Sequence, residues 1–241
     1  MNMRRLAFVA ALVLSFVPLG IDGANSESAG AASFNAESTL TAALAYGAHQ
    51  SSMTAHGSIT EGSLTLDTNI AFSPAGSIVT TGVLGTGTEY LARSASGVYF
   101  VKADSLPVLR SILMVKEPTG AEINVWYKIP ASDPRYASIA SPGGAQTIAQ
   151  TFSFSPVGWS QKVTDGGVVT LRGTRVIKLI GASNLTVDGT GFKKQDLYVT
   201  DTAHPIPFAM SAEAGTTGDI YFSKWDATKV VMPTAKSDLP R

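Results

Sequence analysis

The stretch MTAHGSITEGSLTLDTNIAF, residues 53–72, decides the fold of this 241-residue chain. Around a turn at Glu61-Gly62, apolar residues alternate with polar ones: Met53, Ala55 and Ile59 before the turn, and Leu64, Leu66, Ile70 and Phe72 after it. A period of two is typical of strands that bury one face and expose the other. The stretch therefore predicts a long antiparallel hairpin.

The same period continues beyond this hairpin. Three more short strands are expected at 78–84, 89–93 and 98–102, because turns rich in Gly, Pro and Ser divide them. Later strands are expected at 123–129, 169–171, 177–179, 185–187, 197–200, 206–212, 220–225 and 229–232, with Val169, Leu171, Ile177 and Leu179 on one face. Connections this short join antiparallel neighbours, so about eleven strands predict one antiparallel sheet.

Three segments carry apolar stripes at helical spacing. They are 36–50 (Leu40, Ala43, Leu44, Gly47), 105–113 (Leu106, Leu109, Ile112, Leu113) and 141–152 (Ala145, Ile148, Ala149, Phe152). A sheet with one apolar face must cover it, and these helices are the candidates. The predicted fold is α+β, with a single, strongly curved antiparallel sheet wrapped around a few short helices. Periodicity leaves open whether the space between the two layers is packed core or an apolar cavity.

Composition excludes several function classes. Eighteen Lys and Arg balance eighteen Asp and Glu, and charged residues make up only 15% of the chain. Nucleic acids and anionic membrane surfaces both require clustered cations, so neither is expected as a partner. The chain contains no cysteine, which excludes disulfides, thiol catalysis and cysteine metal sites.

The N-terminal segment has the layout of an export signal. Arg4 and Arg5 precede an apolar run from Leu6 to Leu19, and 29–31 (Ala-Gly-Ala) matches the small-x-small cleavage pattern. We expect a signal peptide at 1–31, a flexible leader at 32–35 and one domain at 36–241. Cleavage near residue 23 and retention as an uncleaved anchor are the alternatives. The expected location is secreted or periplasmic.

No constellation in the sequence indicates catalysis. The histidines are His49, His56 and His204, and no two of them have the spacing of metal ligands. No G-x-S-x-G motif is present, and Gly82, Gly85 and Gly87 do not open a helix as a dinucleotide loop would. The chain is therefore expected to be a non-enzyme without a cofactor or metal. An unrecognised hydrolase ranks well below the binding functions.

Several segments, in their order along the chain, resemble a known family. A helix near 36–50 leads into the 53–72 hairpin, and Val98–Lys102 (VYFVK) lies just before a helical region. Trp126–Pro130 (WYKIP) follows that region, and the last parts are Leu197–Thr200 (LYVT), His204–Pro207 (HPIP), Tyr221–Trp225 (YFSKW) and Val230–Pro233 (VVMP). Over residues 36–235 the pattern is similar to the mycobacterial LppX and LprG-type lipoproteins, which share the fold of the LolA and LolB carriers. The family's lipidated cysteine is absent from this chain.

The resemblance implies a half-barrel sheet and a cavity that holds the acyl chains of a lipid or lipidated molecule in transit through the cell envelope. Helix residues expected to line it are Leu106, Leu109, Ile112, Leu113, Ile148 and Phe152, and sheet residues are Leu66, Ile70, Leu171, Ile177 and Leu179. The apolar stripe of the 105–113 helix is either ordinary core or, in a functional role, a cavity wall or a mobile lid, and Trp126 and Trp225 could sit at the cavity mouth. A monomer is expected, with a membrane transporter or envelope protein as a further partner. The alternative is a non-catalytic sensor or interaction module with a filled core.

Overall fold

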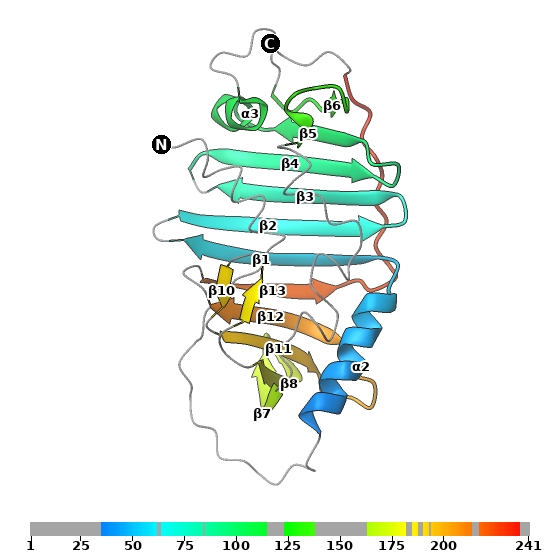
Figure 1. The fold of residues 1–241 in the computed structure, drawn as a ribbon, viewed down its shortest axis with the longest axis vertical. Helices are drawn as coiled ribbons and strands as arrows, with labels where there is room; N and C mark the ends of the chain where they lie inside the picture. The colour runs from blue at the N-terminus through cyan, green and yellow to red at the C-terminus, as the bar shows by residue number, and fades with distance from the viewer. Residues whose placement is uncertain are drawn as a thin grey trace.

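One large antiparallel sheet dominates the molecule. The computed structural model describes residues 35–61, 64–83, 85–114, 123–137, 163–181, 185–187, 190–192, 194–213 and 217–236. Within these residues, eleven strands form a single open sheet (Figure 1). In spatial order they are β6 (Tyr127–Ile129), β5 (Tyr99–Ala103), β4 (Gly87–Ser94), β3 (Gly76–Val83), β2 (Leu64–Ser73), β1 (Met53–Glu61), β13 (Thr217–Ser223), β12 (Pro207–Glu213), β11 (Lys194–Thr200), β8 (Thr174–Gly181) and β7 (Val163–Leu171). The α+β class and the open half-barrel sheet are confirmed.

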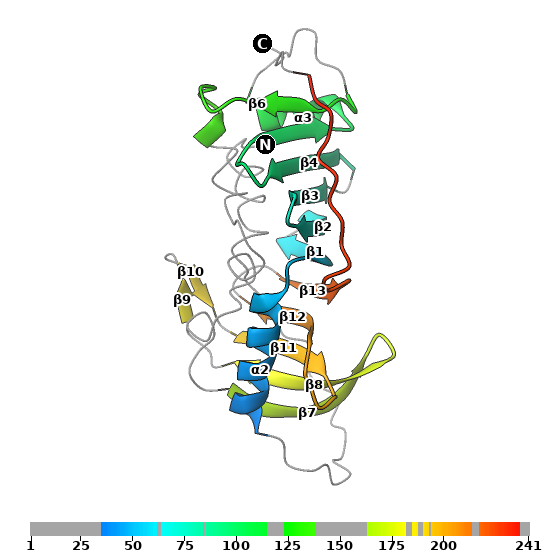
Figure 2. The same cartoon turned by 90° about the vertical axis from the view of Figure 1, so that its right-hand side faces the viewer.

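Two described helices pack on one face of the sheet, which we call the inner face. Helix α2 (Ala36–His49) packs on β7 and β12, and helix α3 (Leu106–Leu113) packs on β4 and β5. The ribbon of β9 (Leu185–Val187) and β10 (Thr190–Phe192) lies on the same side as α2 (Figure 2). The two helices therefore lie at opposite ends of the sheet, and β1, β2 and β3 lie between them (Figure 1).

Helix α2 forms where the sequence predicts it. Asn35 caps its start by accepting a hydrogen bond from the Ser38 N–H at 3.0 Å. Its apolar stripe is buried on the sheet, at Leu40, Ala43, Leu44 and Gly47. These side chains share one core cluster with inner-face residues of the sheet, among them Met53, Ile70, Leu179, Leu197 and Phe222. A second cluster forms under α3 and includes Leu91, Val101, Leu109, Leu113 and Tyr127.

The pairing of β1 with β13 joins the two halves of the chain into one sheet. Gly57 of β1 lies opposite Ile220 of β13. A Cβ atom added at Gly57 would lie 2.0 Å from the backbone oxygen of Asp219. No side chain larger than hydrogen fits without a backbone shift, so the close approach of the two strands requires glycine here.

The segment 224–236, which we call the strap, runs along the strand ends from β13 to β6 (Figure 2). Its Asp226 N–H donates to the Ser52 carbonyl at 2.8 Å, and its Val230 N–H donates to the Ser73 hydroxyl at 3.2 Å. At its far end Lys236 forms a parallel bridge with Tyr127. The strap thus connects the middle of the sheet to its β6 edge.

Several sequence predictions are wrong in detail. Residues 229–232 belong to the strap and form no strand, and β13 ends at Ser223, before Trp225. The expected strand at 123–129 shrinks to β6, because Asn124 adopts a positive φ of 63° in a turn. The predicted helix at 141–152 lies outside the described residues.

The face assigned to Leu171 is also wrong. Arg172 and Gly173 both have positive φ and form a two-residue turn, so Leu171 pairs with Thr174 while Ile177 pairs with Val168. Because side chains alternate along a strand, Leu171 lies on the face opposite to Ile177 and Leu179. In the described part of the chain, no helix is both long and apolar enough to cross a membrane.

Replacing Gly57 by alanine tests the constraint at the central strand pair. We expect Gly57→Ala to lower the free energy of unfolding by about 1–3 kcal/mol, because its methyl group overlaps a backbone oxygen that cannot rotate away. The matched control is Gly82→Ala on β3, where the new Cβ would meet its nearest atom at an ordinary 3.7 Å. Urea denaturation of both variants measures the difference. Equal stability of the two variants would contradict the constraint.

Candidate functional site

The structure separates the predicted lining residues into distinct places. Leu66 and Ile70 of β2 and Ile177 and Leu179 of β8 all lie buried on the inner face. In α3, Leu109 and Leu113 are fully buried, Ile112 packs beside them, and Leu106 is 43% exposed. Leu171 points to the other face, and Ile148 and Phe152 lie outside the described residues.

The predicted lid helix α3 is anchored at its first turn. Ser105 accepts a hydrogen bond from the Val108 N–H and donates one to the Thr86 carbonyl at 2.8 Å. Asp104 accepts from the Thr88 N–H at 2.6 Å. A Cβ at Gly87 would collide with the side chains of Ser105 and Asp104, so the absence of a side chain there lets β4 approach the helix start closely.

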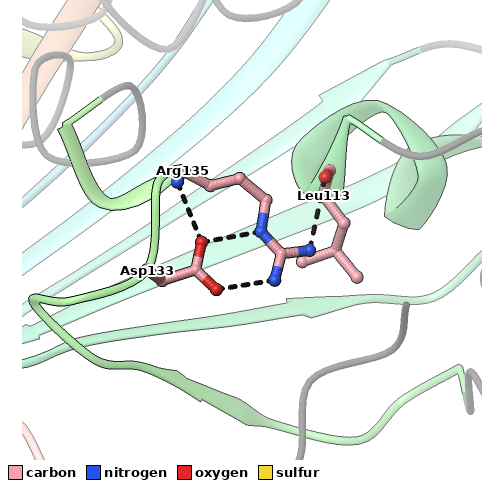
Figure 3. Close-up of polar contacts among 3 residues, drawn as sticks. All are labelled: Leu113, Asp133 and Arg135. Carbon is pink, nitrogen blue, oxygen red and sulfur yellow. Dashed lines mark hydrogen bonds and ion pairs between the residues drawn. The ribbon is translucent and has the colours of Figure 1, made fainter.

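The other end of α3 is held by an ion pair (Figure 3). The guanidinium of Arg135 donates to both carboxylate oxygens of Asp133, at 2.8 and 2.7 Å, and to the Leu113 carbonyl at 3.5 Å. The hydrogen bonds from Arg135 hold the pKa of Asp133 below its usual value. With both ends tied and Leu109 and Leu113 packed beneath, α3 is a fixed end wall, which does not suit a lid.

The inner face has a continuous apolar row that crosses the strands from β1 to β6. Cross-strand pairing aligns six residues in this row: Ala55, Ile70, Val79, Leu91, Val101 and Tyr127. All six are buried. The row connects the core under α3 to the middle strands, which lie between the two helices.

A polar stripe runs beside this apolar row. Thr68 of β2 pairs with Thr81 of β3, and Thr81 pairs with Glu89 of β4. Each lies two residues from a member of the apolar row, so all three face the same side of the sheet. Thr68 and Thr81 are only 1% and 4% exposed, and among the described residues the hydroxyl oxygen of Thr68 has no hydrogen-bond partner.

Glu89 is the ionisable group of this stripe. Burial of the Glu89 carboxyl disfavours its charged form and raises its pKa to about 7. The residue as a whole is half-buried. A carboxyl group can donate a hydrogen bond when it is protonated and accept one in either state.

The outer face carries a separate cluster at the tip of the β7–β8 hairpin. The Arg172 guanidinium lies 3.5 Å from the centre of the Tyr221 ring, and its Nη1 is 2.9 Å from His56 Nε2. Burial and the charge of Arg172 both lower the pKa of His56. A lowered pKa favours neutral imidazole, which can accept from Arg172. In the described segments, no three His, Asp or Glu side chains converge as metal ligands.

The two tryptophans predicted at the cavity mouth lie in different places. Trp126 belongs to the outer face. The centre of its ring lies 6.2 Å from the centre of the Tyr90 ring and 5.5 Å from Lys102 Nζ. Trp225 packs against the α2 core. The centre of its ring lies 5.7 Å from that of Tyr46 and 5.9 Å from that of Phe222. The prediction for Trp126 is therefore wrong, since this side chain faces away from the helices.

The sequence pattern does not predict the polar stripe, although one of its residues departs from the alternation. Thr68 occupies an apolar-face position, between Leu66 and Ile70. A single polar residue in an alternating strand is common. Its meaning depends on the cross-strand neighbours, which only the register supplies.

Arg135→Gln tests whether α3 is a fixed wall. We expect a loss of about 1–2 kcal/mol in the free energy of unfolding at pH 7, because the bidentate pair and the contact with α3 both disappear. The loss should shrink as the pH falls below 3.8, the usual pKa of the carboxyl that Asp133 carries. Arg110→Gln, an exposed position on α3, is the control. A variant as stable as this control would show that the pair does not hold the helix.

A second prediction concerns the pH dependence of stability. In the unfolded chain Glu89 titrates near 4.5, and in the folded chain near 7. The folded state binds the extra proton between these values, so the free energy of unfolding falls as the pH rises through this window. Glu89→Gln carries no charge, so its free energy of unfolding does not fall in this way. We expect the free energy of unfolding of this variant, minus that of the wild type, to rise by on the order of 2 kcal/mol from pH 4.5 to 8. Chemical denaturation of both proteins across this pH range measures the difference. If the two free energies of unfolding change with pH in the same way, Glu89 does not have a raised pKa.

Comparison with known proteins places the fold. No protein-family model and no curated protein sequence matches the chain. Among solved structures, LprF from Mycobacterium bovis is 14% identical, with 83% of this chain and 96% of that chain covered at a TM-score of 0.50. The lipoprotein LppX from Mycobacterium tuberculosis is 9% identical, with 79% and 94% covered at a TM-score of 0.42. The LolA superfamily protein NE2245 from Nitrosomonas europaea is 10% identical, with 83% and 96% covered at a TM-score of 0.27. The likeness to LprF extends over most of both chains and shows that this chain has the same fold, as the resemblance noted in the sequence implies.

Proposed function

We propose that this protein is an exported, non-catalytic carrier that binds the acyl chains of a lipid or lipidated molecule against the inner face of its sheet. The observation that carries the proposal is the distribution of apolar surface. The apolar row crosses the sheet from β1 to β6, while the described helices pack at the two ends. The shared fold with LprF supports the same proposal.

The middle of the inner face is the binding surface in this proposal. Ile70 and Val79 are central members of the apolar row, on the two neighbouring strands β2 and β3. Each buried CH₂ of a ligand contributes about 0.8 kcal/mol, so a long acyl chain supplies most of the binding energy without any charged contact. The inner-face residues predicted from the sequence that keep this role are Leu66, Ile70, Ile177 and Leu179.

The remaining features of the proposal concern the protein's place in the cell. The signal-like segment 1–31 supports export, so the carrier would act outside the cytoplasm, as a monomer. It would exchange its cargo with a membrane transporter or another envelope protein. No metal or cofactor has a role in this mechanism, because apolar burial alone supplies the affinity.

Native mass spectrometry of protein purified from its own export route tests the carrier directly. A lipid that co-purifies at near one-to-one stoichiometry, identified after organic extraction, supports the proposal. Protein that carries no lipid and takes up no fluorescent fatty acyl probe would overturn it. Function would then lie with a surface of the molecule, as in the alternative interaction module.

A bulky side chain on the inner face should block uptake. We expect Val79→Trp to weaken binding of a fluorescent acyl probe at least roughly 10-fold, since an indole on the apolar row occupies space that the ligand would take. Thr80→Trp is the matched control, because the adjacent residue of the same strand faces outward. Probe titration measures binding, and circular dichroism checks that both variants fold. Equal affinities would show that the inner face of β3 is not the binding surface.

A further inference from the structure

The polar stripe is the feature of the inner face that apolar burial leaves unexplained. Thr68, Thr81 and Glu89 lie side by side on three neighbouring strands. Leu66 and Ile70, both 1% exposed, lie on either side of Thr68 along β2. The stripe is thus set within apolar surface on its own strand.

Thr68 provides the strongest evidence that the stripe is a site. Its hydroxyl oxygen is buried and makes no hydrogen bond to any residue that the structure describes. Buried hydroxyls are almost always paired, because an unpaired one loses its hydrogen bonds to water and gains nothing in return. Valine has nearly the same shape and would avoid this cost. A partner from outside the described residues would explain threonine at this position, and a bound ligand is such a partner.

Glu89 adds a second hydrogen-bonding group at the end of the stripe. With its pKa raised to about 7, its carboxyl is protonated in a large fraction of molecules near neutral pH and can then donate as well as accept. The cross-strand neighbour of Glu89 on β5 is Ala103, which carries no charge. Arg93 shares this face of β4 but lies four residues further along the strand, beyond Leu91.

We propose that Thr68, Thr81 and Glu89 bind an uncharged, oxygen-rich group of the cargo, such as the hydroxyl and ester oxygens of a glyceride, and disfavour a phosphate head group. This inference rests on the proposed carrier function and names the ligand chemistry of the same surface. Two hydroxyls and a carboxyl match alcohol and ester oxygens in donor and acceptor number. The stripe itself contains no cation to neutralise a phosphate, and an ionised Glu89 repels one.

The test compares two lipids that share their acyl chains. Acyl-labelled fluorescent dioleoylglycerol and dioleoylphosphatidic acid are titrated into the wild-type protein, Thr68→Val and Glu89→Gln. We expect the wild type to bind the glyceride more tightly. Thr68→Val should weaken glyceride binding roughly 3- to 10-fold and leave phosphatidic acid binding unchanged, because one hydrogen bond is lost. Glu89→Gln should bind phosphatidic acid more tightly than the wild type does, because it lacks the negative charge. The difference in affinity between the glyceride and phosphatidic acid should therefore become smaller.

A stability measurement separates a ligand site from a structural role. Thr68→Val removes an unpaired buried hydroxyl, so the ligand-free variant should melt about 2–4 °C higher than wild type. The matched control is Thr80→Val, which removes a hydroxyl on the outward side of β3 and should not change the lipid preference. A lower melting temperature for Thr68→Val would show that the hydroxyl serves the fold and would overturn the proposal.

The outcomes distinguish this inference from the function on which it rests. If both lipids bind wild type equally and Thr68→Val changes neither affinity, the head-group inference is wrong while the carrier function stands. If wild type binds neither lipid nor a simple acyl probe, the carrier function itself fails.

Discussion

The whole molecule depends on the contact between β1 and β13, where Gly57 lets two strands from opposite ends of the domain approach closely. Within each half of the sheet, most neighbouring strands are joined as hairpins that local turns can specify. The exceptions are β6, which follows β5 after α3, and β11, which follows β8 after the β9–β10 ribbon. The central pair has no such turn, and it alone makes one eleven-stranded surface of two smaller ones. Without it, α2 and α3 would cover two separate sheets.

The two described helices pack on the two ends of this sheet, α2 on β7 and β12 and α3 on β4 and β5. Beneath α3, fully buried Leu109 and Leu113 and the Asp133–Arg135 pair leave a packed wall. Around β2 and β3, the inner face combines apolar side chains with an unpaired hydroxyl at Thr68. On the outer face, Lys178 forms an ion pair with Asp196 at 3.0 Å.

Much of the fold could be read from the alternation of side chains, because burying one face of a strand imposes a period of two. The hairpin at 53–72, helix α2 and helix α3 are all confirmed. The pairing register of the strands is harder to predict from sequence. The two-residue turn at Arg172-Gly173 shifts Leu171 to the opposite face, and a sequence pattern does not show how a turn pairs its flanks. The polar stripe was missed for the same reason, since Thr68, Thr81 and Glu89 are neighbours only through register. Residues 229–232 have the composition of a strand, yet they follow the strand ends as part of the strap.

The strap has a consequence for the order of folding. Its two hydrogen bonds to Ser52, at the start of β1, its one to Ser73 of β2 and its bridge from Lys236 to Tyr127 of β6 need these three strands already in place. It therefore docks last and opens first, with far less protection from hydrogen exchange than the sheet it borders. A chain whose β6 edge is unformed leaves this segment loose and open to proteolysis. The strap thus links the formation of the β6 edge to the ordering of residues 224–236.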